Sequence, residues 1–115
     1  MHLFVIGDRH WLNRPFIEQV LTELHCNYTE AITRLTVPPA IEGNAEQIAA
    51  RWARRAYVPV VEGWPVDGVV LSFHNNLANS DRTVMLLARR VGSLPWVNAT
   101  SMGEWEELAT GKGKL

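Results

Sequence analysis

The chain has 115 residues, of which 47% are hydrophobic and 20% are charged, and its formal net charge is −1 at pH 7. This length fits one domain with its own core, and the near-neutral charge argues against binding nucleic acid through a general basic field. The one cysteine, Cys26, excludes an internal disulfide, and no apolar run reaches the roughly 20 residues of a membrane-spanning helix. These features favour a cytoplasmic protein with no membrane contact, with a single domain over 1–110 and a flexible tail over 111–115.

The first half of the chain predicts alternating strands and helices. Residues 3–7 begin with a continuous apolar run that includes β-branched side chains, as is typical of a strand buried on both faces. A helix is predicted over 14–26, because Asn13 can cap it, Pro15 suits its first turn and apolar residues recur at helical spacing. A second strand is predicted over 33–37, where two prolines end it.

The clearest helical pattern spans 42–56. Asn44 can serve as its N-cap, with Gln47 as the capping-box partner, and the apolar residues that follow lie on one face. The other predicted elements are, in chain order, strands at 58–61 and 69–73, a helix from about 80 to 90, a strand at 95–97 and a helix at 102–108.

This order of elements predicts an α/β fold. Strands separated by helices indicate a doubly wound, mainly parallel, five-stranded Rossmann-like sheet with helices on both faces. In such folds, ligands bind at the carboxyl ends of the strands, near the point where the strand order reverses. Three loops leave those ends, at 7–13, 38–44 and 74–80, and we expect the functional site there.

Four stretches of the sequence carry a family resemblance. They are VIGDRHW at 5–11, AARWARRAYVPV at 49–60, VVLSFHNN at 69–76 and ARRVGSLPW at 88–96. Over about residues 3–98 the chain resembles the SLOG superfamily, in the branch of small YspA/YpsA-related proteins common in bacteria and phages. Distant relatives include LOG-type phosphoribohydrolases and the DNA-processing protein DprA. The resemblance implies a Rossmann-like domain that binds nucleotides or nucleotide-derived ligands with its loops.

The chain departs from the family pattern before the second helix. Members carry Gly-Gly-Ala-x-Gly-Ala-Asp there, whereas this chain has PAIEGNAE at 39–46, with Glu46 at the family Asp and Asn44 at a usual Gly. The Gly-Thr after the fourth strand and the Pro-Gly-Gly-x-Gly-Thr-x-x-Glu motif of LOG enzymes are also absent. Because glycines let the backbone approach a phosphate closely, these losses count against LOG-type phosphoribohydrolase activity.

The candidate ligand-binding residues lie in the three loops. Arg9 offers a forked, permanently charged donor to a phosphate, although it can instead pair with Asp8. Trp11 can stack on a base or a sugar, or pack in the core. The start of the second helix is a natural anion site, but Glu42 and Glu46 flank it and would repel phosphate. These acids can bind ribose hydroxyls instead, or they can merely favour the first helical turn. The candidate set is Gly7, Asp8, Arg9, Trp11, Gly43, Asn44, Glu46, His74, Asn75, Ser80 and Thr83.

Catalytic residues are not assigned by the sequence. Glu46, His74 and Asp81 are the candidates, since His74 can act as a general acid or base, but it can equally order a loop. The four histidines lack metal-ligand spacing, so neither a metal nor a cofactor is expected. Scattered arginines, at 51, 54, 55, 89 and 90, are interpreted as solvated helix faces rather than a nucleic-acid site.

Three functions therefore stay open. The first is a domain that senses or sequesters a nucleotide-derived small molecule at the carboxyl edge of the sheet. The second is a nucleotide-processing hydrolase, with Glu46 or Asp81 as its base. The third is a degenerate SLOG domain that acts as a protein-interaction module or a homo-oligomer, with Trp64 or Trp105 at the interface.

Overall fold

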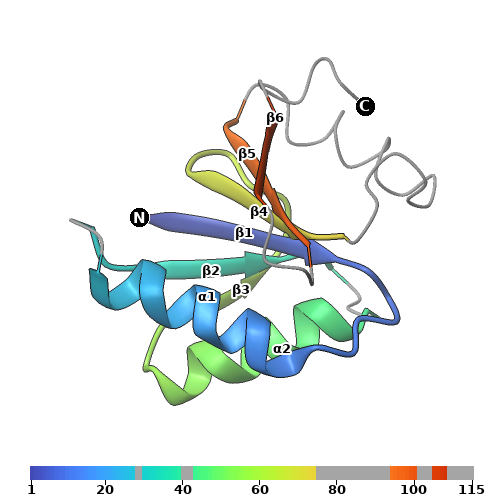
Figure 1. Ribbon diagram of the computed structural model, residues 1–115. Helices are drawn as coiled ribbons and strands as arrows, with labels where there is room; N and C mark the ends of the chain where they lie inside the picture. The colour runs from blue at the N-terminus through green and yellow to red at the C-terminus, as the bar shows by residue number, and fades with distance from the viewer. Residues whose placement is uncertain (28–29, 40–42, 75–93, 101–104, 109–115) are drawn as a thin grey trace.

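A computed structural model describes residues 1–27, 30–39, 43–74, 94–100 and 105–108 (Figure 1). The described elements alternate strand and helix up to β3, and strands alone follow. In chain order they are β1 (His2–Gly7), α1 (Arg14–Asn27), β2 (Arg34–Val37), α2 (Asn44–Arg55), β3 (Val60–Glu62), β4 (Val69–Phe73), β5 (Trp96–Ala99) and β6 (Trp105–Leu108).

The strands form one sheet in the order β3-β2-β1-β4-β5-β6. Neighbours from β3 to β5 are parallel, and β6 is antiparallel to β5. The chain places β2 and β3 on one side of β1 and then returns to place β4 on the other side. The strand order therefore reverses between β1 and β4. The predicted α/β fold is confirmed, with five parallel strands in a Rossmann-like sheet.

The end of the chain differs from the prediction. A helix was expected over 102–108, but Trp105–Leu108 is strand β6, which pairs with β5 from Trp96 to Ala99. The open edge of β5 offers unpaired N–H and C=O groups, and pairing with them outweighs the small helix preference of so short a segment. The helix predicted near 80–90 and the tail at 111–115 lie outside the described residues.

Both described helices pack on the same face of the sheet and against each other (Figure 1). Asn13 caps α1 as predicted, because its Oδ1 accepts a hydrogen bond from the Phe16 N–H (3.3 Å). A hydrogen bond from Trp52 Nε1 to Thr22 Oγ1 (3.0 Å) joins the two helices. The core on this face includes Leu3, Val5, Ile17, Leu21, Leu35, Ile48, Trp52, Leu71 and Phe73. Helices on both faces stay a prediction, because the described helices cover one face.

The opposite face of the sheet is buried as well. Alternate residues of β1, β4 and β5, such as Phe4, Ser72 and Trp96, lie on it and are almost fully buried. Trp64, from the chain between β3 and β4, stacks on Phe4 with ring centroids 6.1 Å apart. Trp96 Nε1 donates to Ser72 Oγ (2.7 Å), which in turn donates to Asn98 Oδ1 (2.8 Å). The polar groups on this apolar face are therefore satisfied by each other.

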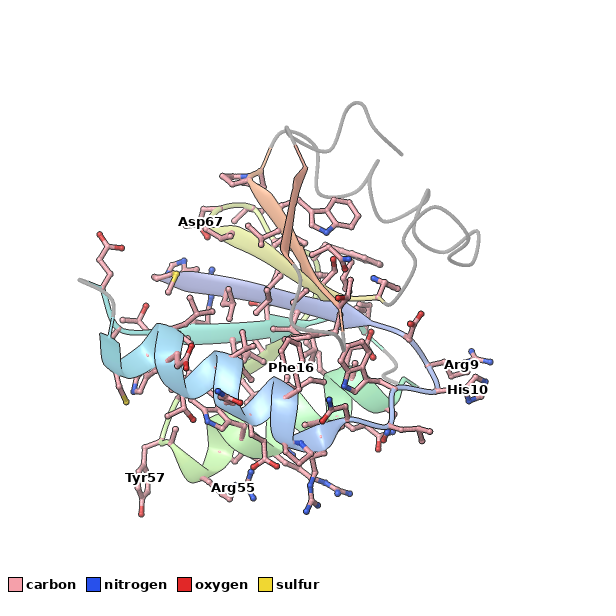
Figure 2. The ribbon with its side chains drawn as sticks, viewed as in Figure 1. Arg9, His10, Phe16, Arg55, Tyr57 and Asp67 are labelled. Atoms are coloured by element: carbon pink, nitrogen blue, oxygen red, sulfur yellow. The ribbon has the colours of Figure 1, made fainter. Side chains whose placement is uncertain are left out.

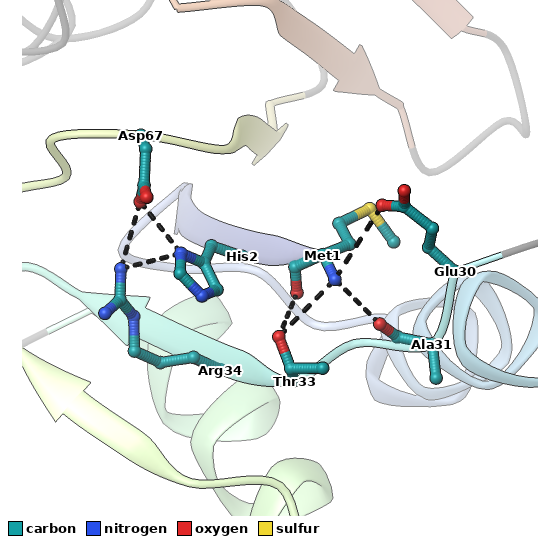
Figure 3. A network of polar contacts seen from close by, with 7 residues as sticks. All are labelled: Met1, His2, Glu30, Ala31, Thr33, Arg34 and Asp67. Carbon is teal, nitrogen blue, oxygen red and sulfur yellow. Dashed lines mark hydrogen bonds and ion pairs between the residues drawn. The ribbon is translucent and has the colours of Figure 1, made fainter.

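The connection from β3 to β4 is fastened at the amino ends of β1 and β2. Asp67 accepts a hydrogen bond from Arg34 Nη2 (3.1 Å) and lies 2.8 Å from His2 Nδ1 (Figure 3). The hydrogen bond with His2 is the main reason that the pKa of Asp67 falls below its ordinary value. Gly68 follows with φ +95°, where a Cβ would collide with the His2 carbonyl oxygen. This corner positions β4 beside β1, at the opposite end of the sheet from the predicted site.

Candidate functional site

Three segments meet at the carboxyl edge of the sheet, where the strand order reverses. The Asp8 N–H donates to the Phe73 carbonyl (2.9 Å), which joins the loop after β1 to the end of β4. The Asn44 N–H donates to the Arg9 carbonyl (3.1 Å), which joins the same loop to the start of α2. The structure thus brings the described parts of the three predicted loops together at one place.

Gly7 lets the first turn of α2 pack against the end of β1. A Cβ at Gly7 would lie 2.5 Å from the Ala45 Cβ and 3.0 Å from the Phe73 carbonyl oxygen. No side chain fits in that space without moving the helix. This glycine is therefore required by helix–sheet packing.

The carboxyl group of Glu46 fills the first turn of α2. Its Oε1 accepts a hydrogen bond from the Gly7 N–H (3.0 Å), and the residue is only 8% exposed. Its Oε2 has no hydrogen-bond partner in the part of the chain that the structure describes. Burial raises the pKa of Glu46, hydrogen bonds from its own N–H and from Gly7 oppose that rise, and the charge of Asp8 adds to it.

His74 directly follows β4, is the last described residue before position 94, and is 4% exposed. Its N–H donates to Asn98 Oδ1 and its carbonyl accepts from Asn98 Nδ2, both at 3.0 Å. Among the described residues, its Nδ1 has no hydrogen-bond partner. Burial lowers the pKa of His74, although the charge of Asp8 and a hydrogen bond with Asn98 act in the opposite direction. The lowered pKa favours the neutral form of this imidazole.

Asp8 links these two buried groups electrostatically. Its negative charge raises the pKa of Glu46 and opposes the fall in the pKa of His74. Two carboxyl groups and one imidazole therefore share this edge. Within the described ranges, no group of three or more His, Cys, Asp or Glu side chains is placed to hold a metal ion.

Trp11 is placed in the core rather than at the edge. The residue is 2% exposed, and its ring packs against those of Phe73 and Phe16, with centroids 5.7 and 6.1 Å away. Its Nε1 donates to the Asn13 carbonyl (2.8 Å). Because no face of the ring is open for stacking, Trp11 leaves the candidate set, and its role is packing.

The predicted capping role of Asn44 is wrong. Gly43 is the N-cap of α2, with no side-chain cap bond among the described residues, and Asn44 is already helical. Its Nδ2 instead donates to the carbonyl of Trp11. Asn44 therefore joins α2 to the loop after β1, and this tertiary contact outweighs the local cap preference.

Arg9 and His10 project from the loop after β1, away from the body of the domain (Figure 2). Both are exposed, so the guanidinium of Arg9 brings positive charge to the outside of the edge. The other predicted residues, Asn75, Ser80, Asp81 and Thr83, lie outside the described residues.

Asn98 is the residue at this edge that sequence reasoning missed. It bonds both backbone groups of His74 and the hydroxyl of Ser72. The signal was an amide in the middle of an otherwise apolar strand, WVNA. A buried amide needs partners, so such a residue indicates a polar network nearby.

Comparison of the chain with protein-family models, with curated proteins and with solved structures returned no match. The resemblance to the SLOG superfamily therefore rests on the sequence stretches alone. In the part of the chain that the structure describes, no helix is long and apolar enough to cross a membrane.

Proposed function

We propose that this domain binds a nucleotide-derived small molecule at the carboxyl edge of its sheet and senses or sequesters it. The observation that carries the proposal is a pair of buried polar atoms, Oε2 of Glu46 and Nδ1 of His74, that lack hydrogen-bond partners among the described residues. Leaving such an atom unsatisfied costs about 1–3 kcal/mol. A ligand that supplies the missing partners recovers that cost.

The position of these atoms supports the proposal. They lie at the carboxyl ends of parallel strands beside the strand-order reversal, which is where open α/β sheets bind ligands. The exposed Arg9 follows Gly7 and Asp8 in the same loop. We assign Arg9 to a phosphate group of the ligand, because guanidinium binds phosphate with two parallel hydrogen bonds.

A thermal-shift screen with nucleotides and ADP-ribose derivatives tests this function. A ligand at ten times its Kd adds about 1.4 kcal/mol, which raises the Tm of a domain of this size by roughly 5 °C. Arg9→Ala should lower affinity at least tenfold and reduce the rise to roughly 1–2 °C. The control is Arg54→Ala, an exposed arginine near the other end of α2. Folded protein that shows no shift with any of these compounds contradicts the proposal.

A second candidate function is hydrolysis of an N-glycosidic or phosphoester bond. It is favoured by the opposite pKa shifts of Glu46 and His74. The raised pKa of Glu46 suits an acid rather than the base expected from the sequence, and the lowered pKa of His74 suits a base. Product formation from a ligand that raises the Tm, lost in both Glu46→Gln and His74→Gln, would support this function. Ligand that stays intact over long incubation supports binding alone.

A further inference from the structure

The start of α2 already contains a negative group that belongs to the protein. The first N–H groups of a helix have no partners within the helix, and they normally attract phosphate or another anion. Here the Glu46 side chain turns back over the first turn, and its Oε1 takes the Gly7 N–H at 3.0 Å. The N–H of Gly7, at the end of β1, is therefore committed to this carboxyl group.

The second oxygen of the same carboxyl group is buried beside Gly43, at the start of α2. Oε2 lies so close to Gly43 that a Cβ there would collide with it, so the missing side chain of Gly43 makes room for this oxygen. Oε2 is buried and has no partner within the described ranges. An ionised carboxylate oxygen accepts hydrogen bonds and donates none, so its partner has to be a donor.

We infer that Glu46 determines which part of a ligand enters the edge: it excludes phosphate from the start of α2 and accepts hydrogen bonds from ligand hydroxyl groups. This inference rests on the proposed function and specifies its ligand class as one with a free sugar diol, such as a ribonucleotide. A phosphate at the same place would meet both Glu46 and the nearby charge of Asp8. Ribose hydroxyls are neutral donors and meet no such repulsion.

The inferred arrangement also orients the ligand. The sugar lies inward, against Glu46, and the phosphate lies outward, where Arg9 is exposed (Figure 2). Positive charge on the outside and negative charge on the inside favour this orientation over the reverse one.

The first experiment titrates inorganic phosphate and follows the amide signals of Gly7, Gly43 and Asn44 by NMR. Glu46→Ala should bind phosphate at least about tenfold more tightly than the wild type, because the variant loses the negative charge at the helix start and frees the Gly7 N–H. Glu46→Gln, which keeps an acceptor for the Gly7 N–H, should show a smaller gain and serves if the alanine variant does not fold. The control, Glu23→Ala on the exposed side of α1, should match the wild type. Equal phosphate affinity in the wild type and the folded Glu46 variants overturns the inference.

The second experiment measures Kd by calorimetry for ADP, 2′-deoxy-ADP and 3′-deoxy-ADP. The wild type should prefer ADP by about tenfold or more, because a hydrogen bond to a charged acceptor is lost in each deoxy compound. In Glu46→Gln that preference should fall to about threefold or less. If the wild type binds all three compounds equally, hydroxyl selection is wrong and the proposed function stands. If it binds none of them or any other nucleotide, the proposed function is wrong and the inference falls with it.

Discussion

Two buried ionisable residues, Glu46 and His74, make the stability of the fold depend on pH in opposite directions. Burial raises the pKa of Glu46, so the folded chain holds a proton on it more tightly than the unfolded chain does. Burial lowers the pKa of His74, so the folded chain holds a proton on this imidazole less tightly than the unfolded chain does. The stability that depends on Glu46 therefore declines as the pH rises above 4.5, the ordinary pKa of this side chain. The stability that depends on His74 declines as the pH falls below 6.5, the ordinary pKa of histidine.

Glu46→Gln should remove the first of these pH effects. As the pH rises above 4.5, the free energy of unfolding of the wild type should fall relative to that of the variant, because only the wild type ionises a buried carboxyl group. Urea unfolding at a series of pH values measures this difference, and the contribution of His74 cancels between the two proteins. If the free energies of unfolding of the two proteins change in parallel with pH, burial does not destabilise the ionised carboxyl group of Glu46.

Tyr57 holds a backbone conformation that favours glycine. Its φ is +59°, the side chain is 94% exposed, and it follows the end of α2. The Tyr57 N–H donates to the Arg54 carbonyl (3.3 Å) and the Val58 N–H donates to the Ala53 carbonyl (2.8 Å). This is the Schellman pattern, with tyrosine at the position where glycine is usual.

Tyr57→Gly should therefore stabilise the domain by about 1 kcal/mol, the approximate cost of a left-handed conformation for a residue with a Cβ. Tyr57→Ala is the matched comparison, because alanine also loses the exposed ring but keeps the Cβ. Chemical denaturation measures the free energy of unfolding of the wild type and of the two variants. If the glycine variant is no more stable than the alanine variant, the left-handed conformation at position 57 does not destabilise the domain.

At the scale of elements, the contact of α2 with β1 supports the candidate site. The contact depends on the absence of a side chain at Gly7, beside Ala45 and the Phe73 carbonyl. Through it the Glu46 carboxyl reaches the Gly7 N–H. A change in this packing should therefore alter both the stability and the site.

Gly7→Ala should destabilise the domain by about 1–3 kcal/mol, because the new methyl group meets a helix Cβ and a backbone carbonyl. Gly43→Ala should cost less, since its methyl group meets only the end of the Glu46 side chain, which can rotate away. Thermal unfolding monitored by circular dichroism compares the two. An equal or larger loss in Gly43→Ala would mean that Glu46 is held more firmly than the Gly7 contact.

At the scale of the whole molecule, local patterns in the sequence predict most of the described fold. The apolar run of β1, the Asn13 cap of α1 and the amphipathic pattern of α2 are local features, and the structure contains all three elements. Strand β6 was missed because its pairing with β5 is a tertiary interaction. The short segment carries no periodicity strong enough to predict that pairing.

The candidate site depends on contacts that no local pattern encodes. Glu46 bonds Gly7 across 39 positions in the sequence, and His74 bonds Asn98 across 24. From the sequence, Glu46 was expected at the start of the second helix, where it would repel phosphate, but its hydrogen bond with the Gly7 N–H was not expected. Trp11 illustrates the same limit, because only the packed core shows that its ring is enclosed by Phe16 and Phe73.

An NMR titration of the labelled protein with ADP tests the central claim most directly, because it locates the binding site. The amide signals of Gly7, Asp8, Gly43 and His74 should shift in a saturable way, because these residues form the carboxyl edge. Signals of Arg34 and Asp67, at the opposite end of the sheet, should stay in place. Largest shifts at Arg34 and Asp67, or no shift in folded protein, would contradict a ligand site at the carboxyl edge.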